Sequence, residues 1–126
     1  MTCVGVANAT APYNRGMTVL LACSTCPDAE TAAALARALV EERLAACVSQ
    51  LPGVTSTYRW QGQVETAGEV ALLIKTTTDR IDALAARLRQ LHPYELPELV
   101  AVEVRAGLPD YLAWVAAQTS PLDPSA

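Results

Sequence analysis

Val70-Ala71-Leu72-Leu73-Ile74 is apolar at every position, so both faces of a strand built from it need cover. The sequence therefore predicts that this stretch is the central strand of a sheet. Outward from it, three further strands are expected: Met17–Ser24, a strand from Ala46 that Pro52-Gly53 bends before it resumes at Thr55–Trp60, and Leu99–Arg105. Gln61-Gly62 separates the second of these from the central strand and favours a hairpin.

Two long amphipathic helices are expected between the strands. The first covers residues 27–44, where Pro27 suits a first helical turn and Asp28 favours the positive end of the helix. The second begins near Thr78-Asp79 and ends near Leu91, because Pro93 cannot continue a helix and biases the residue before it away from the helical region. A last short helix is expected after Gly107-Leu108-Pro109.

The resulting order β-α-β-β-α-β, with a short C-terminal helix, is typical of the ferredoxin-like split βαβ arrangement, an α+β fold. Its antiparallel sheet would carry both long helices on one face. No third layer is left in the chain to cover the other face, so the sequence predicts self-association.

Length and composition limit the function classes. The 126 residues suit one domain, expected at residues 17–118 between flexible tails at 1–16 and 119–126. A net charge of −4 with scattered Lys and Arg makes nucleic acid and membrane surfaces unexpected partners. Residues 1–16 lack the pattern of a signal peptide, so a cytoplasmic location with four reduced cysteines is expected.

The stretch His92-Pro93-Tyr94-Glu95-Leu96-Pro97-Glu98 places the single histidine and two carboxylates in a loop stiffened by two prolines. Stiff loops with several ionisable groups often build sites. Glu95 and Glu98 are candidate metal ligands or an acid–base pair, but no nucleophile stands beside them, and no catalytic residue is assigned. The alternative is a connecting loop in which His92 caps the last helical carbonyls.

Cys23-Ser24-Thr25-Cys26 is a CxxC motif at the expected junction of a strand and a helix. A thiol at a helix N-terminus can exchange disulfides, which makes a thiol redox protein one hypothesis. Alternatively, one thiolate of this motif and the distant His92 hold a soft or borderline ion such as Cu(I) or Zn(II). The structural alternative is that the cysteines are small buried apolar residues.

Several larger side chains stand near strand ends. Tyr58, Trp60, Tyr94 and Trp114 suit packing or a subunit interface, where amphipathic aromatics are favoured. Lys75 ends the central strand, either exposed or paired with a glutamate of the loop.

Five segments in this order resemble the CutA divalent-cation tolerance proteins, from about Met17 to Val115. They are Leu44-Ala45-Ala46-Cys47-Val48, Ser56-Thr57-Tyr58-Arg59-Trp60-Gln61-Gly62, Glu69-Val70 leading to Ile74-Lys75-Thr76, the segment His92–Glu98, and Tyr111-Leu112-Ala113-Trp114.

The resemblance implies a ferredoxin-like fold in a homotrimer similar to PII signalling proteins. It also implies cytoplasmic location, tolerance of copper and other divalent cations, no organic cofactor and no enzymatic activity. Cys23 and His92 then match proposed copper ligands, with Leu91 where some members have a second histidine. Glu98 or Glu95, from the same or a neighbouring subunit, would complete the metal site, and Tyr58, Trp60, Lys75, Tyr94 and Trp114 would line an intersubunit cleft. Binding of a small ligand there, and a scaffold whose trimer surface is the functional part, are further hypotheses.

Overall fold

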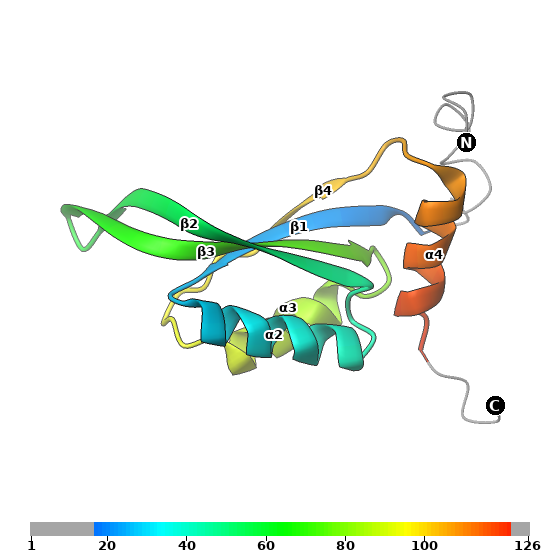
Figure 1. Ribbon diagram of the computed structural model, residues 1–126, viewed down its shortest axis with the longest axis horizontal. Helices are drawn as coiled ribbons and strands as arrows, with labels where there is room; N and C mark the ends of the chain where they lie inside the picture. The colour runs from blue at the N-terminus through cyan, green and yellow to red at the C-terminus, as the bar shows by residue number, and fades with distance from the viewer. Residues whose placement is uncertain (1–16, 122–126) are drawn as a thin grey trace.

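The computed structural model describes residues 17–121 as a four-stranded sheet with three helices (Figure 1). Its elements are β1 (Val19–Cys26), α2 (Ala29–Glu41), β2 (Cys47–Trp60), β3 (Gln63–Thr77), α3 (Ile81–Leu91), β4 (Val100–Glu103) and α4 (Pro109–Thr119). This order, and the α+β class, are as predicted. The tail predicted at residues 1–16, and residues 122–126 of the tail predicted at 119–126, lie outside the described residues, whereas Thr119 is the last residue of α4.

The sheet has the strand order β2-β3-β1-β4, and every neighbouring pair is antiparallel. The pairing of β2 with β3 is irregular between Leu51 and Val54, where Pro52-Gly53 was predicted to bend the strand. Gly53 has a φ of 78°, a left-handed conformation that favours glycine. The central strand is longer than the predicted core of residues 70–74, because β3 begins directly after the turn at Gln61-Gly62.

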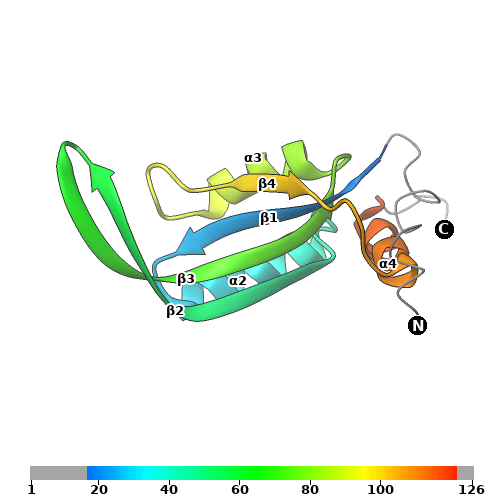
Figure 2. The ribbon, with the colours of Figure 1, turned by 90° about the horizontal axis from the view of Figure 1, so that it is seen from above.

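The two longest strands therefore form a hairpin that extends past the other two strands and curls out of the plane of the sheet (Figures 1 and 2). Tyr58 pairs with Glu65 and Val54 with Glu69 along this outer part. Helices α2 and α3 do not cover this outer part of the hairpin, so its side chains can form a site on the surface.

Helices α2 and α3 lie together on one face of the sheet (Figure 1). Alternate strand residues point into this layer, and Ala22, Leu72 and Ile74 have no exposed surface. They pack with Leu35 and Leu39 of α2, and Leu84 and Leu88 of α3, in the main hydrophobic core.

The opposite face of the sheet is left largely uncovered. Leu51, Val100 and Val102 are 41%, 58% and 62% exposed, respectively. Helix α4 packs only at the end of the sheet near Val19 and Ala46 (Figure 2). The side chain of Arg43 holds the C-terminus of this helix by donating to the carbonyls of Ala117 and Ser120 at 2.8 and 2.6 Å.

Two predicted helix starts differ from the structure. Strand β1 continues to Cys26, two residues past its predicted end, and α2 begins at Ala29 with Asp28 as its N-cap, accepting from the Thr31 amide at 2.7 Å. The second long helix, predicted to begin near Thr78-Asp79, begins at Ile81, because Thr78 Oγ1 accepts from the Thr18 amide and α3 has no side-chain cap. No helix within residues 17–121 is long and apolar enough to span a membrane.

Candidate functional site

A cleft of about 760 Å³ lies between the outer part of the β2–β3 hairpin and the loop that follows α3. Both of its walls belong to one protomer. Its lining combines carboxylates with aromatic and small side chains: Thr25, Pro27, Ser56, Thr57, Tyr58, Arg59, Trp60, Glu65, Ala67, Gly68, Glu69, Tyr94, Glu95, Leu96 and Glu98. The cleft therefore contains Tyr58, Trp60, Tyr94, Glu95 and Glu98 from the predicted site.

The loop wall is held in place by His92. Its Nε2 lies 2.7 Å from the carbonyl oxygen of Thr25, and its Nδ1 lies 3.1 Å from the amide nitrogen of Tyr94. A carbonyl only accepts, so Nε2 carries the proton and donates, while Nδ1 accepts from the amide. The imidazole is 7% exposed, with both nitrogens bonded within the protein.

His92 does end the helix, but differently from the capping alternative. Its backbone amide, rather than its ring, donates to the Leu88 carbonyl at 2.8 Å, and its φ and ψ of −77° and 136° are extended. Farther along the loop, Ser24 Oγ donates to the Glu98 carbonyl at 2.7 Å. Strand β1 therefore anchors both ends of the segment from His92 to Glu98.

The floor of the cleft is organised by Glu69, which the sequence did not single out as a site residue. Tyr94 Oη donates to Glu69 Oε2 at 2.7 Å. Burial alone would raise the pKa of Glu69, but hydrogen bonds from Ser56, Tyr94 and Thr25, with a smaller contribution from His92, lower it below its ordinary value. The same pair raises the pKa of Tyr94, through burial first and the bond to Glu69 second.

The two cysteines of the CxxC motif lie in β1 and point to opposite faces of the sheet. Cys26 is fully buried in the core beside α2 and α3, and Cys23 lies on the open face next to Leu73 and Val100. Three strand residues span about 10 Å, beyond the reach of a disulfide without backbone movement. The placement at a helix N-terminus was wrong, and with it the basis for redox exchange between these two thiols.

The thiol near His92 is Cys26, with Sγ 3.9 Å from Nε2. Burial, with Asp28 and Glu69 nearby, raises the pKa of Cys26 to about 11, which disfavours the thiolate that binds metals. Cys23 points away from this contact, so a Cys23–His92 copper pair does not fit within one protomer.

The remaining predicted residues, Lys75 and Trp114, lie at the other end of the molecule. Lys75 Nζ contacts Ser49 Oγ at 3.2 Å rather than a glutamate of the loop. Trp114 stacks at 5.6 Å on Tyr111 of α4, and both rings are more than 40% exposed. They form a second partly apolar surface, separate from the cleft.

Glu65, Glu69, Glu95 and Glu98 give the cleft a negative character, and Tyr58 and Trp60 give it an aromatic wall. Among residues 17–121, no three His, Cys, Asp or Glu side chains are grouped so as to hold a metal ion by themselves. The arrangement suits cations or hydrogen-bond donors whose remaining ligands come from elsewhere.

Sequence reasoning missed Glu69, Ser56 and Thr25 because each is an unremarkable polar residue on a strand. A signal exists for Glu69. It starts the apolar run of β3 in phase with Ala71 and Leu73, and so shares their open face. The partner Tyr94 could not be inferred, since it is distant in sequence.

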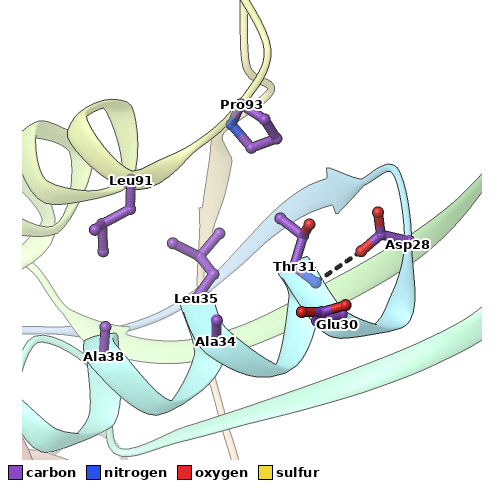
Figure 3. Close-up of a pocket in the computed structure, with 8 residues that line it drawn as sticks. All are labelled: Asp28, Glu30, Thr31, Ala34, Leu35, Ala38, Leu91 and Pro93. Carbon is purple, nitrogen blue, oxygen red and sulfur yellow. Dashed lines mark hydrogen bonds between the residues drawn. The ribbon is translucent and has the colours of Figure 1, made fainter.

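A second, smaller groove of about 460 Å³ lies between α2 and α3 (Figure 3). Its floor is formed by apolar side chains, among them Ala34, Leu35, Ala38 and Leu91. The carboxylate of Asp28 at its end is already bonded to the Thr31 amide, as the dashed line in Figure 3 marks. The groove thus lacks the converging polar groups of the cleft, which remains the candidate site.

Comparisons with known proteins agree with this architecture. Residues 20–118 match the family model described as CutA1 divalent ion tolerance protein. The divalent-cation tolerance protein CutA of Thermus thermophilus is 50% identical over 95 residues, covering 75% of this chain and 92% of that protein. Protein CutA of Mus musculus is 47% identical over 91 residues, covering 72% of this chain and 51% of the mouse protein.

Solved structures are similar over the same region. The crystal structure of CutA from Xylella fastidiosa has a TM-score of 0.80 at 54% identity, covering 82% of this chain and 99% of that one. CutA1 from Oryza sativa has a TM-score of 0.80 at 36% identity, covering 82% of this chain and 94% of that one. The chain therefore belongs to the CutA1 divalent ion tolerance protein family.

Proposed function

We propose that this chain is a non-enzymatic protein of divalent-cation tolerance that binds a divalent cation, such as copper, or a small cationic ligand in the acidic cleft. The observation that carries the proposal is the position of Glu65, Glu69, Glu95 and Glu98 around one cavity. Carboxylate oxygens are suitable ligands for divalent cations. The family name supports the cation, and the cytoplasmic location stays a prediction.

The Glu69 carboxylate is the centre of the proposed site. Its lowered pKa keeps it charged at neutral pH, and Tyr94 fixes its orientation through one oxygen. Glu95 and Glu98 approach from a loop that His92 holds against β1. Because no three such ligands converge within the described protomer, water or a neighbouring copy would supply the rest.

We further propose that ferredoxin-like protomers assemble as a homotrimer similar to PII proteins. The uncovered sheet face, with Leu51, Val100 and Val102 exposed, supports burial against other copies. The long unpaired edge of β2 supports strand pairing across the boundary. Sedimentation of the full chain at low micromolar concentration should show a trimer, and a monomer boundary would contradict this assembly.

Calorimetric titration of the reduced full chain with Cu²⁺ tests the cation site. Binding should weaken at least about tenfold in Glu69→Gln and in a Glu95→Gln/Glu98→Gln double variant, because the cleft loses negative charge and ligand oxygens. Glu30→Gln, which removes an exposed carboxylate of α2 outside the cleft, is the matched control and should leave the affinity unchanged.

Cys23→Ser distinguishes copper binding in the cleft from copper binding at Cys23, the ligand suggested by the family resemblance. If the cleft holds the ion, this variant binds copper as the unmodified chain does. Loss of binding in Cys23→Ser, with full binding in the glutamate variants, would move the ion to the open face of the sheet and overturn the cleft proposal. Absence of saturable binding in the unmodified chain would overturn both cation sites.

A further inference from the structure

A second cluster of reactive side chains lies on the open face, at the end of the sheet opposite the cleft. Cys47 of β2 and Lys75 of β3 are direct cross-strand partners. Lys75 Nζ lies 4.0 Å from Cys47 Sγ and 3.2 Å from Ser49 Oγ. The thiol and the amine are each partly buried within the protomer.

The cluster is closed on one side by α4. Tyr111 hydrogen-bonds the Cys47 side chain, and burial first, then Cys47, raises the pKa of this phenol. The salt bridges in the described part of the chain join Arg37 to Glu41 and Arg87 to Glu42, so neither involves Lys75. Within residues 17–121, the side-chain contacts of the amine are with the Ser49 hydroxyl and the Cys47 thiol.

We propose that Cys47 is a site of oxidative modification in which the Lys75 amine captures the oxidised sulfur. A peroxide oxidises the thiol to a sulfenic acid, Cys47–SH + H₂O₂ → Cys47–SOH + H₂O. The Lys75 amine then attacks the sulfur and displaces the hydroxyl as water, Cys47–SOH + H₂N–Lys75 → Cys47–S–NH–Lys75 + H₂O. The S–N bond ties β2 to β3. Sulfenic acids condense with a backbone nitrogen to a sulfenamide, and the lysine amine is a nitrogen nucleophile of the same kind.

The reaction requires a partly exposed thiol and a lysine amine beside it, and each of the other described thiols lacks one of the two. Cys26 is completely buried, and its pKa is raised to about 11. Cys23 shares the open face and is partly exposed, but its cross-strand neighbours are Leu73 and Val100, which carry no amine. Cys23 is thus a matched internal control: a similar thiol on the same face without a lysine opposite.

Mass spectrometry after treatment of the reduced, native full chain with hydrogen peroxide tests the proposal. Digestion with trypsin should yield a linked peptide pair joining Cys47 to Lys75, lighter than the sum of its parts by two hydrogens, or about 2 Da. Cleavage after Lys75 should be lost, and dithiothreitol should restore both peptides. A native protein in which Cys47 stays reduced, or oxidises without joining Lys75, would overturn the proposal.

Two controls keep the outcome interpretable. Lys75→Arg retains the positive charge but replaces the amine, so the linked peptide should disappear while dimedone labels the Cys47 sulfenic acid. Cys23→Ser should leave the yield of the linked peptide unchanged. In the unmodified chain unfolded in guanidinium before peroxide is added, the link should also be lost, since only the fold brings the two groups within 4.0 Å. An equal yield in unfolded protein would show that the fold has no part in the reaction.

Discussion

The two faces of β3 differ in what their side chains do: one face packs in the hydrophobic core, and the other carries the ionisable side chains. Val70, Leu72 and Ile74 point into the helix layer and are at most 7% exposed. Glu69 and Lys75 point to the other face, where Glu69 joins the cleft and Lys75 contacts Cys47. Because successive side chains of a strand point to opposite faces, the residues that stabilise the core and the residues of the candidate sites alternate along β3.

Adjacent leucines of β3 give the largest expected contrast. Leu72→Ala should lower the free energy of unfolding by about 2–5 kcal/mol, because it leaves a cavity in the core between sheet and helices. Leu73→Ala, on the open face, should cost the isolated protomer clearly less and should instead weaken self-association. Chemical denaturation and sedimentation of both variants measure the two effects. Equal destabilisation without any effect on assembly would contradict the division of the faces.

The stability of the fold should depend on pH through Glu69, at the end of the open face that carries the cleft. Its folded-state pKa lies below the ordinary value of 4.5, so the stability it contributes is present above that value and is lost as the pH falls through the folded-state pKa. Glu69→Gln should therefore be less stable than the unmodified chain at neutral pH, and the difference should shrink in acid. Urea denaturation between neutral pH and about pH 3 measures it.

Tyr94→Phe sharpens this measurement, because it removes one donor to the carboxylate and leaves the ring in place. The pH dependence attributable to Glu69 should then be smaller but still present, since Ser56 and Thr25 remain as donors. A Tyr94→Phe variant with the full pH dependence would show that the bond to Tyr94 does not stabilise the charged carboxylate.

Part of this fold could be predicted from short stretches of sequence. Local signals located the end of α3 at Leu91, through Pro93, and the irregularity in β2, through Pro52-Gly53. These are properties of a few adjacent residues. The sheet face on which Cys23 lies could not be predicted from local sequence, because the apolar run around it shows no alternation from which to assign a face.

The candidate site depends on pairing that no local pattern encodes. Tyr94 meets Glu69 because β1 anchors the loop after α3 beside the hairpin, and Cys47 meets Lys75 because of the register of β2 on β3. A register is set by the whole sheet, and a shift by one residue would exchange the faces. The loop and its carboxylates were therefore predictable, whereas the partners were not.

Two adjacent threonines at the end of β3 give the smallest and most discriminating contrast. Thr76 and Thr77 are both fully buried, but Thr76 Oγ1 donates to the Leu44 carbonyl at 2.6 Å, whereas Thr77 Oγ1 has no partner within residues 17–121. Thr76→Val should cost about 1–3 kcal/mol, because it leaves a buried carbonyl without its donor. Thr77→Val should be neutral or stabilising by up to about 1 kcal/mol, since it replaces an unsatisfied hydroxyl by a methyl group of similar size.

Thermal and urea unfolding of the two threonine variants measure a difference of sign rather than of size. Equal destabilisation would mean that the buried Thr77 hydroxyl does have a partner in solution, such as a bound water. The covered and open faces of β3 would then be equally satisfied at this end. A stable Thr77→Val beside a weakened Thr76→Val would instead show that, of the two buried hydroxyls at this end of β3, the one facing α2 and α3 is satisfied and the one on the opposite face is not.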